Sequence, residues 1–186
     1  MRISLTTIMI LCLSVAIGQQ AAVADEVEFQ TVKAKYFSKD KFVFPRDIKG
    51  GKLTVLFLAL SDSQENGQYQ QTALLEWHAA LSERGVFSDD VVPYHFPVLE
   101  SPPFFVKGII ANAMSDEYEG KVPLDQAGVI YVDDLNAFAE AANVANDGQP
   151  TIIIASANAL PLQSFKGEVS PEGVDEIIAA ISGYIE

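Results

Sequence analysis

The chain has 186 residues, of which 49% are hydrophobic, and its 12 basic and 25 acidic residues give a formal net charge of −13. A phosphate backbone repels so acidic a protein, so we expect no nucleic-acid partner, and an anionic membrane surface is unattractive for the same reason. This length and hydrophobic content are typical of one folded domain with a substantial core.

The first 24 residues are typical of a cleaved export signal. Arg2 supplies the positive start, an apolar run covers residues 8–17, and residues 22–24 read Ala-Val-Ala, a small-residue cleavage site. The run is shorter than the roughly 20 residues that span a bilayer, so we expect no stable membrane insertion after cleavage. We predict a signal peptide over residues 1–24, one domain over residues 25–186, and a periplasmic location.

The only cysteine, Cys12, lies within this leader, so the predicted mature protein has no thiol. Thiol–disulfide exchange, peroxide reduction through a cysteine and cysteine-ligated metal sites all need a thiolate. The composition of residues 25–186 therefore excludes these classes of function.

The first half of the domain predicts a central strand followed by a long helix. Residues 25–52 mix charged and aromatic residues and end on two glycines, which indicates a short first strand and a wrapped segment. Residues 53–60 form an unbroken apolar run, as expected of a parallel strand with both faces covered. After Ser-Asp-Ser at 61–63, apolar residues recur at helical spacing over residues 64–84, and Gly85 ends the helix.

The middle of the chain predicts an inserted strand and helix. Residues 91–99 alternate, and the two prolines Pro93 and Pro97 cannot donate ladder hydrogen bonds, which predicts a strand at a sheet edge. Ser101-Pro102 predicts the start of a helix. The polar and acidic stretch 115–126 predicts a surface loop.

The final third of the chain predicts a β-α-β-β-α unit. A strand over residues 129–132 is followed by a helix that Asp134 caps. A turn then leads to a buried strand over residues 152–155, and residues 162–169 return antiparallel to it. Ser-Pro-Glu at 170–172 begins an amphipathic terminal helix.

This order, with Pro150 directly before an apolar strand and Gly167 in the second hairpin strand, resembles the second half of thioredoxin-fold proteins. The resemblance implies an α/β fold: a thioredoxin-like three-layer sandwich with a central mixed sheet and an inserted strand–helix unit. It also implies that the proline is cis and faces the loop that holds two cysteines in redox members. Here that loop reads Ser-Asp-Ser-Gln-Glu-Asn-Gly over residues 61–67.

Two narrower families share this organisation. The YtfJ-like family of exported bacterial proteins resembles the chain over roughly residues 45–185, with a thiol-free loop, an inserted strand and helix, and the same terminal unit. This likeness implies a fold and a compartment more than an activity. The mitochondrial ATP-synthase assembly chaperones are similar around residues 47–50 and the strand after them, but their signature aromatic and arginine residues near the last hairpin are missing here.

Candidate chemistry is sparse. His78 and His95 are the only histidines, nothing in the sequence places them together, and we expect no metal site and no cofactor. A serine nucleophile in the Ser-Asp-Ser segment 61–63 would need a base, and a helix cap explains these residues more simply. We expect the acidic residues 115–120 to be a solvated face rather than a calcium site, and we assign no catalytic residue.

The remaining candidate for a functional site is a binding surface. In redox members of the fold, extended peptide binds beside the cis proline, and a thiol-free relative can keep that groove for binding alone. The resemblance assigns this groove six residues: Ser61, Asp62, Ser63, Gln149, Pro150 and Thr151. The alternative is that Pro150 only shapes a turn.

We therefore expect an exported, non-redox thioredoxin-like protein that binds envelope proteins or peptides, or helps to assemble them. Two alternatives stay open at this point. The first is a hydrolase-type enzyme, and the second is a small-ligand-binding protein; both would use the loop over residues 61–67.

Overall fold

The computed structural model describes residues 28–185, so the predicted leader and Cys12 lie outside the described residues. The elements, in chain order, are β1 (Val32–Tyr36), β2 (Lys41–Phe44), β3 (Leu53–Leu60), α1 (Gln64–Glu83), β4 (Val91–Glu100), α2 (Phe104–Tyr118), β5 (Gly128–Val132), α3 (Leu135–Ala141), β6 (Thr151–Ser156), β7 (Pro161–Lys166) and α4 (Pro171–Ile185). No helix in this range is both long and apolar enough to span a bilayer.

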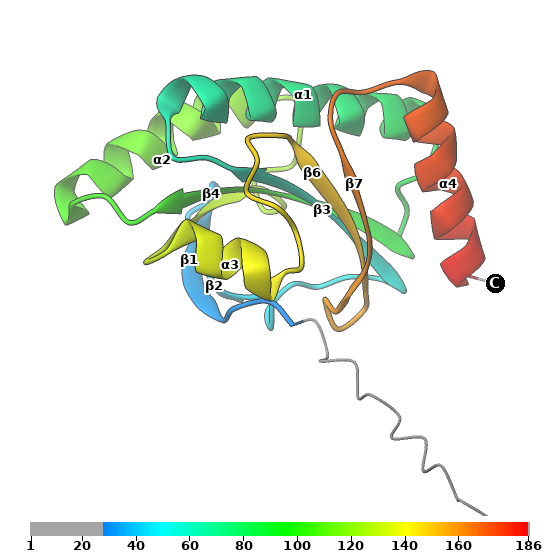
Figure 1. The fold of residues 1–186 in the computed structure, drawn as a ribbon, viewed down its shortest axis with the longest axis horizontal. Helices are drawn as coiled ribbons and strands as arrows, with labels where there is room; N and C mark the ends of the chain where they lie inside the picture. Colours follow the sequence, from blue (N-terminus) through cyan, green and yellow to red (C-terminus); the bar gives the residue numbers. More distant parts are fainter. Residues whose placement is uncertain (1–27, 186) are drawn as a thin grey trace, which may run out of the picture.

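The strands form one mixed sheet in the order β2-β1-β5-β4-β3-β6-β7 (Figure 1). Helix α3 packs against one face, while α1 and α4 pack against the other. The end of α2 packs beside β5 in a third, smaller cluster around Tyr118. The predicted α/β three-layer sandwich is therefore confirmed.

Strand β3 is the centre of the sheet. All eight of its side chains are buried, as the unbroken apolar run predicts. Leu56 and Leu58 face the cluster that contains Phe138 of α3. Val55 and Phe57 face the opposite cluster, which contains Trp77 of α1.

Strand β4 is central, so the prediction of an edge strand is wrong. It pairs in parallel with β3 along most of its length and with β5 from Val98 onwards. His95 donates its backbone N–H toward β5, to Gln126 O at 2.9 Å. Because backbone N–H groups point alternately to the two sides of a strand, Pro93 and Pro97 face the same way as His95. The backbone N–H groups that these two prolines lack would therefore point toward β5, at positions before the pairing of β4 with β5 begins. The hydrogen bonds between β4 and β3 are unaffected.

The helix of the inserted unit begins and ends later than predicted. It begins at Phe104, with Pro103 at its N-cap and no side-chain cap. Ser101 instead donates its backbone N–H to Val132 O at 2.8 Å, which extends the pairing of β4 with β5. Residues 115–118, predicted as loop, are the last turn of α2, because the fully buried Tyr118 anchors that turn in the core.

The segment predicted as one strand and a wrapped stretch contains two strands. β1 and β2 pair antiparallel, and β1 also pairs with β5, so the hairpin forms one edge of the sheet. Along β2, Phe42 and Phe44 are buried while Lys41 is exposed. The terminal β-α-β-β-α unit agrees with the prediction, including Asp134, whose Oδ1 accepts the backbone N–H of Ala137 at 2.9 Å.

Gly128 lies where β1 approaches β5, and it offers a test of this edge. A Cβ at Gly128 would come within 2.5 Å of Lys35 O. We expect Gly128→Ala to lower the free energy of unfolding by about 1–3 kcal/mol, because β1 must move away from β5. Urea unfolding followed by circular dichroism measures this loss.

Gly108→Ala in α2 is the matched control, since nothing lies within 4 Å of a Cβ built there. An alanine in a helix interior is expected to stabilise by about 0.5–1 kcal/mol relative to glycine. A loss of stability in the control equal to that of Gly128→Ala would contradict the close approach of the two strands.

Candidate binding groove

The loop after β3 is held by its own serines. Ser63 is the N-cap of α1, and its Oγ accepts the backbone N–H of Asn66 at 3.3 Å. Ser61 is buried; its Oγ donates to Ser63 O at 2.7 Å and accepts the Ser63 N–H at 3.2 Å. Asp62 is exposed beside them. The predicted helix cap is therefore Ser63, while Ser61 closes the turn that precedes the helix.

Gln70 completes the end of the central strand. Its Nε2 donates to Leu60 O at 2.7 Å, and its Oε1 accepts the Leu60 N–H at 3.1 Å. Strand β6 does not supply these bonds, because its pairing with β3 ends where Thr151 lies opposite Leu58. The buried side-chain amide thus takes the place of a strand residue and satisfies both backbone groups.

The loop also contacts the segment before β6. Gln70 Nε2 donates to Asn66 Oδ1 at 2.6 Å, and Asn66 Nδ2 donates to Gly148 O at 2.9 Å. These bonds join the start of α1 to the turn that precedes Pro150. The predicted groove residues 61–63 and 149–151 are therefore linked through Asn66 and Gly148.

The three predicted groove residues after this turn differ in accessibility. Pro150 and Thr151 are buried and Gln149 is exposed. The cis peptide bond within residues 28–185 joins Phe44 to Pro45, so the Gln149–Pro150 bond is trans, unlike the cis proline that the thioredoxin resemblance implies. None of residues 149–151 lines the cleft beside the loop over residues 61–63.

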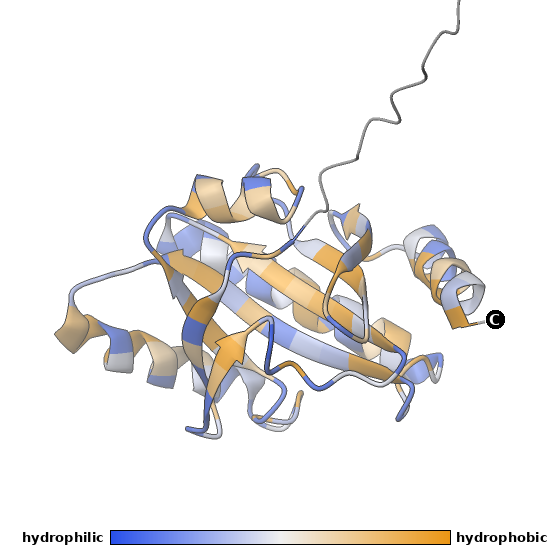
Figure 2. Ribbon diagram, turned by 90° about the horizontal axis from the view of Figure 1, so that it is seen from below, coloured by the Kyte–Doolittle hydropathy of each residue, from blue (hydrophilic) through white to orange (hydrophobic). Residues whose placement is uncertain are grey.

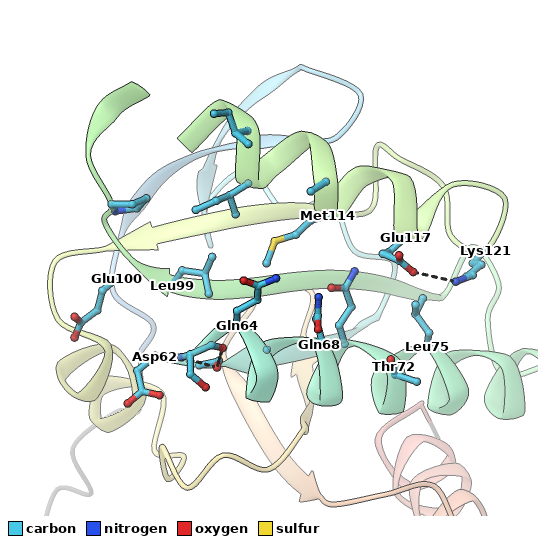
Figure 3. A pocket seen from close by; sticks show the side chains of 18 of the residues that line it. Asp62, Gln64, Gln68, Thr72, Leu75, Leu99, Glu100, Met114, Glu117 and Lys121 are labelled. Atoms are coloured by element: carbon cyan, nitrogen blue, oxygen red, sulfur yellow. Dashed lines mark hydrogen bonds and ion pairs between the residues drawn. The ribbon is translucent and has the colours of Figure 1, made fainter. Parts of the chain in front are cut away.

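That cleft lies between α1 and α2 and has a volume of about 1010 Å³ (Figure 3). Gln64, Gln68 and Leu75 of α1 point into it, Met114 points into it from α2, and Leu99 of β4 lies at its base. We call this cleft the α1–α2 groove. Three of the six predicted groove residues line it, namely Ser61, Asp62 and Ser63.

The α1–α2 groove is acidic. In Figure 3, Asp62 and Glu100 lie at one end of the groove and Glu117 lies at the other. Glu76 of α1 also lines it, and Lys121 is the one basic residue among the lining residues. Lys121 Nζ lies 3.8 Å from Glu117 Oε2, so its charge is already paired. The lining thus carries an excess of carboxylates, which attracts cationic groups.

Helix α2 exposes apolar side chains beside this groove. Phe104, Phe105 and Ile109 are 91%, 76% and 69% exposed, and Ile109 also lines the groove. In Figure 2, the first turn of α2 is hydrophobic and stands at one end of the molecule, away from the sheet. Contiguous exposed apolar surface of this kind is typical of an interaction site.

Most of the groove was not predictable from the apolar periodicity of α1. That periodicity singles out the stripe that faces the core, which includes Ala73, Trp77 and Leu81. The groove is lined by a second stripe with the same spacing of four residues, which reads Gln64, Gln68, Thr72 and Glu76. A polar stripe adjacent to the core stripe was the available signal, but solvent-facing stripes look the same in sequence.

His78 and His95 form a hydrogen-bonded pair, contrary to the expectation that nothing brings them together. His95 Nε2 lies 3.0 Å from His78 Nδ1, and one nitrogen donates to the other. His95 is fully buried and stacks on Phe57 with ring centroids 4.2 Å apart. Burial lowers the pKa of both histidines, and the proximity of His78 lowers the pKa of His95 further. The pair is therefore neutral at pH 7 and joins α1 to β4.

The described residues bring neither histidine to the two serines of the loop. A serine nucleophile needs a base within hydrogen-bond reach, but the two histidines of the chain bond each other rather than Ser61 or Ser63. The Ser61 hydroxyl already donates to the backbone. Within residues 28–185, no three histidine, cysteine, aspartate or glutamate side chains gather into a metal site.

Comparisons with known proteins bear on the fold. No protein-family model matches the chain, and no curated protein matches it. Yeast Sco1 with copper bound is similar in structure, with a TM-score of 0.56 and 11% identity over 85% of this chain and 94% of that chain. A putative electron transfer protein from Aquifex aeolicus VF5 has a TM-score of 0.57 and 13% identity over 86% and 96%.

A third similar structure is BsSco, described as a member of the Sco family of cytochrome c oxidase assembly proteins. Its TM-score is 0.51, at 9% identity over 86% of this chain and 94% of that chain. At such identities the likeness concerns the fold alone. The chain has a thioredoxin-like fold.

The contacts of Gln70 predict a large effect of its removal. We expect Gln70→Leu to lower the free energy of unfolding by about 2–4 kcal/mol, because the buried N–H and C=O of Leu60 lose their partners. Urea unfolding measures the loss. Gln68→Leu on the same helix is the control, because Gln68 is exposed and its replacement should change stability by less than about 0.5 kcal/mol. A Gln70→Leu variant as stable as the control would contradict the role of Gln70.

The histidine pair predicts that stability falls in mild acid. Both folded pKa values lie below the ordinary 6.5, so below pH 6.5 the unfolded chain binds protons that the folded chain does not. The free energy of unfolding should be constant just above pH 6.5 and fall as the pH drops from 6.5 to 5. His95 alone contributes up to about 1.4 kcal/mol per pH unit.

Urea unfolding at a series of pH values checks this dependence. Since His78 and His95 are the only histidines, His95→Phe should remove most of the slope between pH 5 and 6.5 while keeping an aromatic ring beside Phe57. An unchanged slope in this variant would show that other groups cause it.

Proposed function

We propose that this protein binds polypeptide segments of other exported proteins in the α1–α2 groove, without redox chemistry. The groove carries the proposal. Its volume of about 1010 Å³ stands at the upper end of the roughly 300–1,000 Å³ that small-molecule pockets occupy. The exposed Phe104 and Phe105 extend the apolar surface beyond it, which favours a ligand larger than a metabolite.

The absence of thiols supports binding alone. The only cysteine of the chain is Cys12, in the predicted leader, and the loop over residues 61–67 has hydroxyl, carboxyl and amide groups in place of a dithiol. A bound polypeptide would therefore exchange no disulfide with this protein. Retention and release would be governed by noncovalent contacts.

Export of the chain is part of the proposal. The signal-like residues 1–24 support a periplasmic location, and the resemblance to the YtfJ-like family of exported bacterial proteins agrees with it. BsSco is described as belonging to a family of assembly proteins for cytochrome c oxidase. We propose an analogous kind of work here, in which the protein holds a segment of an envelope protein during assembly.

Two competing functions use the same loop. A hydrolase would act through Ser61 or Ser63, but the Ser61 hydroxyl is engaged by the backbone and the histidines are paired with each other. A small ligand would leave the apolar surface at the start of α2 uncovered. The contacts of the loop and the exposure of α2 therefore favour a polypeptide ligand.

An array of overlapping short peptides from exported proteins tests the proposal without assuming their composition. We expect the purified protein to bind a subset of them, and Thr72→Trp to abolish that binding, because Thr72 is exposed and lines the groove. Ser82→Trp is the matched control on the same helix, since Ser82 is exposed and outside the lining.

The control variant should bind like the unmodified protein. Binding that survives Thr72→Trp, or the absence of any bound peptide, would overturn the proposal. Turnover of a generic ester by the purified protein, lost in Ser61→Ala, would favour the hydrolase instead.

A further inference from the structure

We propose that the ligand of the α1–α2 groove is a cationic, apolar segment of polypeptide in extended conformation, one backbone carbonyl of which accepts a hydrogen bond from Gln71 Nε2. This inference rests on the proposed function and adds the chemistry of the ligand. It combines three independent features of the groove: its charge, its apolar base and one buried donor without a partner.

The charge of the groove selects for basic side chains. Asp62 and Glu100 lie at one end and Glu117 lies at the other, and Glu76 of α1 also lines the groove. The nearest cation, Lys121, is held by Glu117 at 3.8 Å. A lysine or arginine of a ligand at the end that Asp62 and Glu100 form would meet carboxylates without a competing cation of the lining.

The base of the groove selects for apolar side chains between those charges. Leu75, Leu99 and Met114 come from three different elements and lie spaced along the groove (Figure 3). Ile110 of α2 extends the same surface. A ligand that alternates basic and apolar residues would place its apolar side chains on this base and its charges near the rim, as extended peptides do along a groove.

Gln71 supplies the observation that points to a backbone ligand. It lines the groove, it is only 5% exposed as a residue, and its Nε2 has no hydrogen-bond partner within residues 28–185. Buried amide donors are nearly always paired, so we expect an unpaired donor in the wall of a groove to bond an acceptor on the ligand. A carbonyl of an extended peptide is free to accept, whereas the carbonyls of a helical peptide are used within the helix.

The length of the groove sets the length of the ligand. The lining residues of α1 run from Gln64 to Ala79, which corresponds to about 22 Å at the helical rise of about 1.5 Å per residue. An extended peptide rises about 3.3 Å per residue, so about seven residues span the groove.

Fluorescence anisotropy with defined peptides tests the ligand class. The probe is a labelled peptide of about seven residues in which lysine and leucine alternate, and its partner has glutamate in place of each lysine. We expect the lysine peptide to bind at least about ten-fold more tightly, and to weaken by about ten-fold between roughly 0.05 and 0.5 M NaCl. The double variant Glu76→Gln/Glu117→Gln should weaken it further, while Glu140→Gln, an exposed site on α3, should not.

The donor is tested by Gln71→Met, which keeps the shape of the side chain and removes the amide. We expect this variant to bind the lysine peptide several-fold more weakly and to unfold at a higher urea concentration, because it no longer buries an orphan donor. These opposite signs separate a ligand-facing donor from a structural one. Unchanged peptide affinity in Gln71→Met would overturn the assigned hydrogen bond.

The remaining outcomes separate this inference from the proposed function. Equal affinity for the lysine and glutamate peptides would overturn the cationic ligand while the peptide array still supported peptide binding. Loss of binding to both peptides and to the array would overturn the inference and the proposed function together. Binding to phosphatidylcholine vesicles that competes with the lysine peptide would identify the apolar surface of α2 as a membrane contact and overturn the inference.

Discussion

The burial of strand β3 on both faces and along both edges constrains the rest of the structure. Its two faces require cover, which α3 supplies on one side and α1 with α4 on the other. Its edges require hydrogen-bond partners, which β4 and β6 supply as far as they reach. Where β6 falls short, the amide of Gln70 takes over at Leu60. The start of α1 is thereby bound to the end of β3, and the loop over residues 61–67 is held between them.

The sequence was sufficient to predict those elements that depend on interactions between neighbouring residues. The apolar run of β3, the Ser63 cap and the amphipathic α4 each depend on residues adjacent in sequence, and the structure has them where the pattern predicts. The prolines of β4 led to the wrong prediction of an edge strand. The sequence shows that two backbone N–H donors are missing, but not on which side of the strand they would lie. Likewise, the approach of His78 to His95 depends on the register of α1 over β4, which neither segment encodes alone.

The candidate site, too, could be predicted from the sequence only in part. The end of the groove at residues 61–63 could be placed from the order of strands and helices, because this loop must follow the central strand. Its second wall could not, because the apolar residues of α2 suggest a buried face, whereas Phe105 and Ile109 are exposed. Hydrophobic periodicity describes a helix with an apolar side, but it does not say whether that side meets the core or another molecule.

The serine at the start of the loop limits which side chains can occupy its position. In a thiol-bearing loop of this fold, two cysteines lie two residues apart, and the corresponding substitutions here would fall near Ser61 and Gln64. The Ser61 hydroxyl, however, both donates to and accepts from the backbone of Ser63 within a buried turn. A sulfur at that position is a weaker donor and acceptor. A cysteine at position 61 would therefore weaken the turn that leads into α1.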